Sequence, residues 1–143
     1  MTIYLDMDGT IADLYSVNNW LEDLRAEKVR PYAEAKPLVN LSRLARYIHK
    51  AQAKGYSVGI ISWLSKTGSI AYDEAVTEAK LKWLSTHLPS VKWNEIHIVK
   101  YGTPKSTCRN DEGFLLDDEE KNLTEWGKGA IPAESIFDFF GSL

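Results

Sequence analysis

Short apolar runs rich in β-branched and aromatic residues alternate with longer helical patterns along this chain. The expected strands are residues 2–6, 56–62, 95–99 and 113–117. The expected long helices are 41–54 and 73–88, and two more should follow, one containing Leu123 and Trp126 and one running from Pro132 through Phe140. Strands that alternate with helices of ten or more residues predict parallel βαβ units. We therefore expect an α/β fold, with a three-layer doubly wound parallel sheet that helices cover on both faces.

The helix expected over 73–88 is assigned from its apolar spacing. Leu81, Leu84 and Leu88 recur at helical intervals, so they should share one buried face. Pro89 ends the pattern because proline cannot continue a helix.

One segment interrupts the alternation of strands and helices. Residues 14–39 form a polar, partly helical insertion between the first strand and the first long helix. The insertion is too short to be a second domain, and a chain of 143 residues fits one domain by size. We therefore expect a single domain, residues 1–143, with 14–39 as a small cap over the strand ends.

Composition and charge exclude several classes of protein. The net charge is −3, with acidic and basic residues interspersed, so nucleic-acid binding through a basic arm is not expected. Cys108 is the single cysteine, which excludes an intramolecular disulfide and a zinc site built on several thiolates. The sequence has neither a signal-peptide pattern nor an apolar run of about 20 residues. We expect a cytoplasmic protein without a membrane partner, and the sequence does not indicate its oligomeric state.

Reactive side chains follow the expected strands at the points where the strands end. They are Asp6 and Asp8 after the first strand, Ser62 after the second, Lys105 after the third, and Asp117 and Asp118 after the fourth. Ligands of a doubly wound sheet bind at the carboxyl ends of its strands. These carboxylates, the lysine and the hydroxyl should therefore converge on one edge of the sheet.

Several carboxylates in one crevice repel each other unless a cation is present. A set of oxygen ligands without histidine or cysteine suits a hard ion, so we expect Mg²⁺. A calcium loop is excluded because it requires glycine where, counted from Asp6, this chain has Ile11. Asp117 and Asp118 could instead cap the following helix, and which of the two binds the metal directly stays open.

The same residues can divide the steps of phosphate-ester hydrolysis. A carboxylate can attack phosphorus and form an aspartyl-phosphate, which splits one difficult reaction into two easier ones. A second acid two residues later can protonate the leaving oxygen and later deprotonate the attacking water. Lys105, with Lys100 and Lys66 as competitors, would neutralise the phosphoryl group, and Ser62 would donate a hydrogen bond to it.

These residues also resemble the four motifs of the haloacid dehalogenase-like (HAD) phosphohydrolases, in the right order and over essentially the whole chain. The matching stretches are DMDGT at 6–10, the apolar strand into Ser62, Lys105, and LLDD at 115–118. The resemblance implies a Rossmann-like sheet, Asp6 as the nucleophile and Asp8 as the general acid/base. It also implies that Ser62 and Lys105 bind phosphate, while Asp117, with Asp118, holds Mg²⁺ beside Asp6 and the Asp8 backbone carbonyl.

Finer features of the resemblance concern the substrate. An aspartate at position 8 is the mark of phosphatases in this family, and the insertion resembles a small helical cap. The phrases GTPK and DDEEKN, with Trp126 beyond them, are similar to the 5′(3′)-deoxyribonucleotidase-like branch, although SWLS at 62–65 departs from its threonine-rich second motif. The expected activity is hydrolysis of a small phosphometabolite, with a (deoxy)nucleoside monophosphate as the leading candidate.

Two other readings stay open at this point. A short cap leaves room for a larger substrate, such as a nucleic-acid 3′-phosphate or a phosphoprotein. The chain could also be a phosphate-binding regulatory module without turnover. Aromatic residues that could stack on a substrate are Trp20, Tyr32, Trp63 and Trp126, and we expect each of them to pack in the core or on the surface instead.

Overall fold

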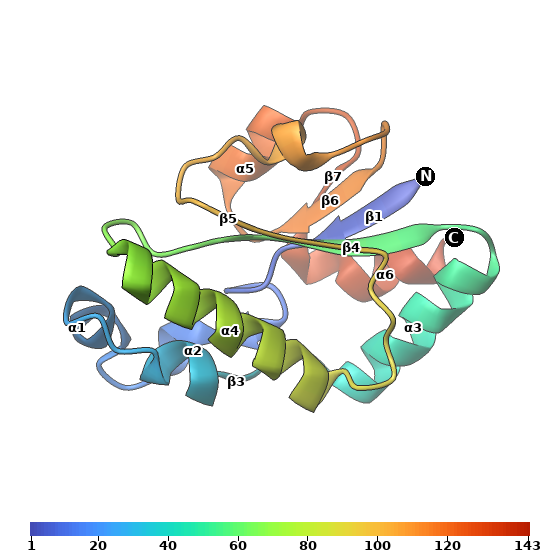
Figure 1. The fold of residues 1–143 in the computed structure, drawn as a ribbon. Helices are drawn as coiled ribbons and strands as arrows, with labels where there is room; N and C mark the ends of the chain where they lie inside the picture. The colour runs from blue at the N-terminus through green and yellow to red at the C-terminus, as the bar shows by residue number, and fades with distance from the viewer.

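A five-stranded parallel sheet forms the centre of the molecule in the computed structural model, which describes residues 1–143 (Figure 1). In chain order the strands are β1 (Thr2–Leu5), β4 (Ser57–Trp63), β5 (Glu95–Val99), β6 (Phe114–Asp117) and β7 (Ala130–Pro132). Their order across the sheet is β5-β4-β1-β6-β7, and every neighbouring pair is parallel. The expected doubly wound α/β fold is confirmed.

Helices cover both faces of this sheet. On one face lie α3 (Leu41–Ala53), α4 (Ile70–His87) and α6 (Ile136–Gly141), and on the other lie α5 (Glu120–Trp126) and the short 3-10 helix η2 (Lys105–Cys108) (Figure 1). The expected three layers are therefore present. None of the helices combines the length and the apolar character that a membrane span requires.

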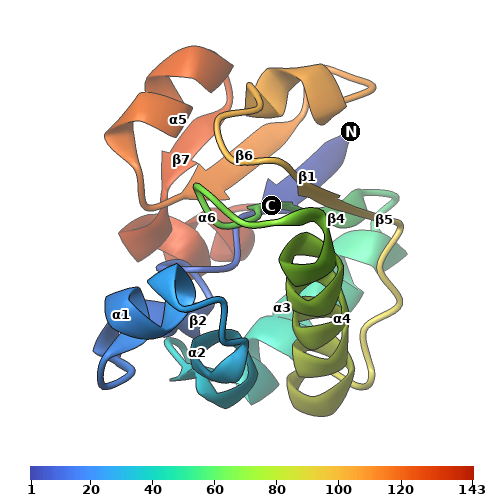
Figure 2. The same ribbon diagram turned by 60° about the vertical axis from the view of Figure 1, so that its left-hand side comes forward.

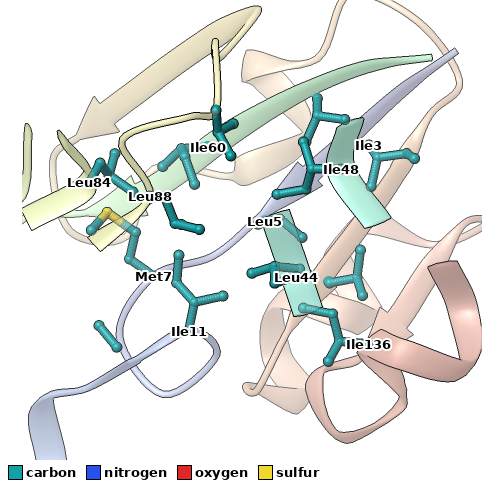
Figure 3. Close-up of a cluster of buried hydrophobic side chains, with 14 of the residues drawn as sticks. Ile3, Leu5, Met7, Ile11, Leu44, Ile48, Ile60, Leu84, Leu88 and Ile136 are labelled. Carbon is teal, nitrogen blue, oxygen red and sulfur yellow. The ribbon is translucent and has the colours of Figure 1, made fainter. Parts of the chain in front are cut away.

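Strand side chains alternate between two apolar cores. Ile3 and Leu5 of β1 point to the face covered by α3, where they pack in one cluster with Leu44 and Ile48 (Figure 3). Tyr4 points to the opposite face, in a smaller cluster with Ile61, Leu115 and Trp126. Because successive side chains of a strand point to opposite faces, strands buried on both sides must be apolar almost throughout.

The buried face of α4 differs from the expected one. Leu84 and Leu88 are buried as predicted, but Leu81 is 42% exposed. The face that packs inward consists of Tyr72, Val76, Lys80, Trp83 and Leu84. The prediction was wrong because it followed leucines alone, whereas a lysine and two aromatic residues occupy this face.

The chain beyond α5 contains a strand that the sequence did not reveal. Residues Ala130–Pro132 form β7 at the edge of the sheet, so Pro132 ends a strand and does not begin a helix. A 3-10 turn, η3 (Ala133–Ser135), then leads into α6. Proline is tolerated here because an edge strand has a free side that does not need every N–H donor.

The insertion forms a small cap that begins and ends in a two-stranded antiparallel ribbon, β2 (Ala12–Asp13) and β3 (Lys36–Pro37). Between these strands lie η1 (Leu14–Ser16), α1 (Trp20–Arg25) and α2 (Arg30–Glu34). Figure 2 shows α1 and α2 on the same side of the sheet as α4, and α2 packs against α4.

Hydrogen bonds from α4 hold the cap in place. The indole N–H of Trp83 donates to the Ala35 carbonyl at 2.7 Å, and the Tyr72 hydroxyl donates to the Lys28 carbonyl at 2.8 Å. Tyr32 of α2 belongs to an apolar cluster that also includes Tyr72. The cap is therefore tied to the body of the protein through one helix.

Candidate active site

The site lies where β1 and β6 end side by side. Leu5 pairs with Leu116, so the residues that follow, Asp6 and Asp117, are neighbours across the sheet. The Asp6 N–H donates to the Leu116 carbonyl at 2.9 Å and holds the two strand ends in register. β1 is also the strand from which the chain winds outward in both directions, which is where ligands of such sheets bind.

Three carboxylates converge at this point. One oxygen each of Asp6, Asp117 and Asp118 lies within 4.8 Å of the others. Asp6 and Asp117 are buried, whereas Asp118 is exposed. The predicted cluster of Asp6, Asp117 and Asp118 is therefore assembled by the fold, and its donors are all oxygen atoms.

Lys105 bridges two of these carboxylates. Its Nζ atom lies 2.7 Å from Asp6 Oδ1 and 2.7 Å from Asp117 Oδ2, and the side chain is 1% exposed. Burial opposes the charged form of this lysine, but the negative charges of Asp6 and Asp117 outweigh that effect and raise the pKa of Lys105. Of its two predicted competitors, Lys66 lines the same cleft without reaching these carboxylates, and Lys100 lies outside the cleft.

Further donors orient the two buried carboxylates. The Thr10 hydroxyl donates to Asp6 Oδ2 at 3.1 Å. Asp117 accepts hydrogen bonds from the Glu119 N–H at 3.0 Å and from the Asn122 side-chain amide at 3.1 Å. Thr10 and Asn122 were not predicted as site residues, although each follows a predicted aspartate by four or five positions.

The cluster carries more negative charge than Lys105 can neutralise. Burial, followed by the charge of Asp6, raises the pKa of Asp117. Asp118 is exposed as a residue, but its carboxyl group faces the cluster, where loss of water and the charge of Asp6 raise its pKa to about 8. A divalent cation relieves such crowding, so the residues fit a hard, oxygen-preferring ion.

Asp8 lies beside the cluster but is not part of it. Gly9 turns the chain after Asp8 with φ +85°, and a Cβ at this position would clash with the Asp118 carboxylate. The Asp8 side chain turns instead to Lys80 of α4, whose Nζ atom lies 2.9 Å from Asp8 Oδ2. Of the predicted metal ligands, Asp8 therefore keeps only its backbone carbonyl as a candidate donor.

Lys80 also contacts the predicted phosphate-binding hydroxyl. Its Nζ atom lies 2.6 Å from Ser62 Oγ, and both side chains are buried. Lys80 was missed in the sequence because lysines on helices are usually solvated. Its spacing in the sequence could have indicated that it is buried, since Val76, Lys80 and Trp83 lie at helical intervals on one face.

A cleft of about 390 Å³ opens in front of Lys105 and the carboxylates, whereas Ser62 and Lys80 lie behind its lining. Its polar end consists of the acids and Lys105, and its walls carry the aromatic rings of Tyr15, Trp20, Tyr32, Trp63 and Tyr101. Tyr15 stacks edge-on against Trp20 in the cap with ring centroids 5.0 Å apart, and Trp63 lies 4.9 Å from Tyr101 on the other side. Trp20, Tyr32 and Trp63 line this cleft, and Tyr32 is at the same time buried in an apolar cluster against which Trp20 packs, as expected. Trp126 packs in the core, where it is 2% exposed, and this expectation is confirmed.

Solved structures with this fold include the following two. The chain is similar to D,D-heptose 1,7-bisphosphate phosphatase from Burkholderia thailandensis, with a TM-score of 0.54, 18% identity, and coverage of 87% of this chain and 70% of that one. It is also similar to a chain of the Pnkp1/Rnl/Hen1 complex, with a TM-score of 0.57, 15% identity, and coverage of 92% of this chain and 44% of that one. No protein-family model and no curated protein matches the sequence. At these identities the likeness shows that the chain has the same fold as both structures.

Proposed function

We propose that this protein is a Mg²⁺-dependent phosphomonoester hydrolase of the HAD type that works through an aspartyl-phosphate. The observation that carries the proposal is the buried Asp6 carboxylate, held by Lys105 at 2.7 Å beside Asp117 at the ends of β1 and β6. The fold likeness to a heptose bisphosphate phosphatase supports the same reaction class.

The proposed metal site is formed by Asp6, Asp117 and Asp118, with the Asp8 backbone carbonyl as a further donor. A bound Mg²⁺ would neutralise the crowded acids and draw electron density from a phosphoryl oxygen. Asn122 and the Glu119 N–H fix the orientation of the Asp117 carboxylate, as surrounding donors do for metal ligands.

In the first step, a carboxylate oxygen of Asp6 forms a bond to phosphorus as the bond to the leaving oxygen breaks. Asp8, as the carboxylic acid, gives its proton to that leaving oxygen. In the second step, Asp8 takes a proton from water as the water oxygen attacks phosphorus, and the Asp6 carboxylate leaves. Inorganic phosphate is then released, and Asp8 is again protonated for the next turnover. Lys105 and Ser62 bind the phosphoryl oxygens, whose negative charge they stabilise in both transition states.

The aromatic walls of the cleft support a substrate with a planar ring. Rings from the cap, from the end of β4 and from the loop after β5 face one space next to the proposed phosphate site. Aromatic side chains that bind a base by stacking tolerate every base, because each base has a π-face. The proposed substrate is therefore a (deoxy)nucleoside monophosphate, in line with the resemblance to the 5′(3′)-deoxyribonucleotidase-like branch.

A second candidate substrate is the 3′-phosphate of a nucleic-acid end. The rim supports it, since Tyr15 is 46% exposed and Tyr101 is 48% exposed, so a longer chain could pass over both rings. The net charge of −3 counts against it, because nucleic-acid binding depends on cationic contacts to phosphates. A silent binding module is disfavoured, because every position that the reaction needs holds a competent side chain.

The test of this proposal measures phosphate release in the presence of Mg²⁺ from nucleoside monophosphates, sugar phosphates, an aryl phosphate and an oligonucleotide 3′-phosphate. We expect the nucleoside monophosphates to have the highest kcat/KM. A preference for the oligonucleotide would select the second candidate. Failure to release phosphate from any of these, by a folded protein with Mg²⁺ bound, would contradict the hydrolase assignment.

A further inference from the structure

Lys80 is a fully buried cation that has no direct role in the proposed hydrolysis. It enters from the middle of α4, and its side chain is 1% exposed. Its Nζ atom lies 2.9 Å from Asp8 Oδ2, 2.6 Å from Ser62 Oγ and 2.6 Å from the Trp63 carbonyl oxygen. Because an ammonium has three N–H donors, these three acceptors use all of them. Lys80 therefore has no donor left for a substrate.

The contact with Asp8 leaves one carboxyl oxygen free. Oδ2 accepts from Lys80, and Oδ1 has no partner in the protein. A carboxyl group held by one oxygen can present the other to the leaving group in a single orientation. Asp8 precedes the turn at Gly9 and its side chain is 16% exposed, so without Lys80 it would have no side-chain partner.

The contact with Lys80 determines whether the Ser62 hydroxyl donates or accepts its remaining hydrogen bond. An ammonium only donates, so Ser62 Oγ must accept the hydrogen bond from Lys80. The Ser62 hydroxyl makes no other hydrogen bond, and its own proton is free to be donated. Lys80 thereby converts Ser62 into a donor, which is the form that a phosphoryl oxygen requires.

The cap closes the pocket of Lys80. The Tyr32 ring of α2 lies 5.0 Å from Nζ, within the range of a cation–π contact. Tyr32 also lines the cleft. The cation thus lies between the cap, the end of β4 and the turn that carries Asp8.

We propose that Lys80 is a positioning residue, which orients the general acid Asp8 and the phosphate-binding hydroxyl of Ser62 together. This inference rests on the proposed function. A lysine that served only to neutralise a buried acid would affect stability, and it would affect all substrates equally. A positioning role has a different signature, because only substrates with poor leaving groups need a proton from Asp8.

The test compares Lys80→Met with Lys82→Met, the same change at an exposed lysine of the same helix. The kcat/KM is measured for a nucleoside 5′-monophosphate and for 2,4-dinitrophenyl phosphate, whose leaving group departs without protonation. We expect Lys80→Met to lose about 10²-fold or more with the nucleotide and about tenfold or less with the aryl ester. Lys82→Met should match the wild type with both substrates.

A second comparison uses Asp8→Asn, in which no general acid remains. In that background Lys80→Met should lose no more with the nucleotide than it loses with the aryl ester, about tenfold or less, because only the effect on Ser62 remains. If Lys80→Met fails to fold, Lys80→Gln is used for the same comparison. Glutamine is polar and of similar length, but it has two N–H donors where lysine has three, and it carries no charge. Equal losses with both substrates, or full additivity with Asp8→Asn, would overturn the positioning role alone. An inactive wild type would instead overturn the proposed function, and the positioning role with it.

Discussion

Lys105 Nζ lies 2.7 Å from Asp6 Oδ1, although the two residues are 99 positions apart in the chain. The same ammonium lies 2.7 Å from Asp117 Oδ2, so one cation ties the end of β1 to the end of β6. All three side chains are buried. The contact makes Lys105 a structural element of the site as well as a proposed phosphate ligand.

Replacing Lys105 by methionine should therefore destabilise the protein. Removal of one partner from a buried ion pair leaves an uncompensated charge and typically costs about 3–5 kcal/mol. We expect a loss of that size in the free energy of unfolding, measured by urea denaturation in EDTA. The matched control is Lys100→Met, at an exposed lysine of the same segment, which should change the free energy by less than about 0.5 kcal/mol. Equal effects of the two changes would show that the bridge does not stabilise the fold.

The stability of the metal-free protein should fall as the pH rises. The pKa of Asp118 is raised from 3.8 to about 8, so the folded protein holds this proton more tightly than the unfolded chain does. The resulting stabilisation is fully present below pH 3.8 and is lost as the pH rises through about 8. Thermal unfolding in EDTA between these pH values measures the effect, with Asp118→Asn as the control. If the variant loses as much stability as the wild type over this window, Asp118 is not the responsible group.

Addition of Mg²⁺ should remove much of that pH dependence. A bound divalent ion stabilises the ionised carboxylates and so stabilises the folded state by mass action. We expect the unfolding temperature at pH 8 to rise with Mg²⁺ concentration and to rise much less in Asp118→Asn. Activity should vanish in EDTA and return with Mg²⁺. Full activity in the presence of EDTA would contradict the metal requirement.

The fold and the positions of the proposed site residues were largely predictable from the sequence. The apolar runs that end in Asp6, Ser62 and Asp117 are strands in the structure, because parallel strands covered on both faces are apolar throughout. β7 was not predictable in the same way, since three residues that end in proline carry no strand periodicity. The carboxyl ends of adjacent strands must meet, and this alone brings Asp6 and Asp117 together.

Other parts of the site depend on tertiary packing that no local pattern encodes. Lys80 reaches Asp8 across 72 positions, and only the position of α4 beside β4 makes that contact. The aromatic walls depend on where the cap is anchored to α4. The sequence around an aromatic residue also does not distinguish a ring packed in a core from a ring that lines a cleft. For this reason Trp20 and Trp63 were assigned to packing, although they line the cleft.

Removal of the Tyr101 ring tests the base-stacking role of the cleft. Tyr101 is 48% exposed and packs against Trp63 with ring centroids 4.9 Å apart, so Tyr101→Ala should leave the fold intact. Loss of one stacking ring corresponds to about 1–3 kcal/mol, or a rise of roughly 5- to 150-fold in KM for a nucleotide. Acetyl phosphate, which has no ring, is the control substrate and should be hydrolysed with an unchanged KM. An equal rise with both substrates would argue against stacking.

Attack of Asp6 on phosphorus is tested most directly by phosphate release from Asp6→Asn with Mg²⁺ present. The control variant is Asp138→Asn, the same change at an exposed aspartate of α6. We expect at least a 10³-fold loss of kcat for Asp6→Asn, with an unchanged circular dichroism spectrum, and wild-type turnover for Asp138→Asn. Substantial turnover by folded Asp6→Asn would contradict the aspartyl-phosphate mechanism.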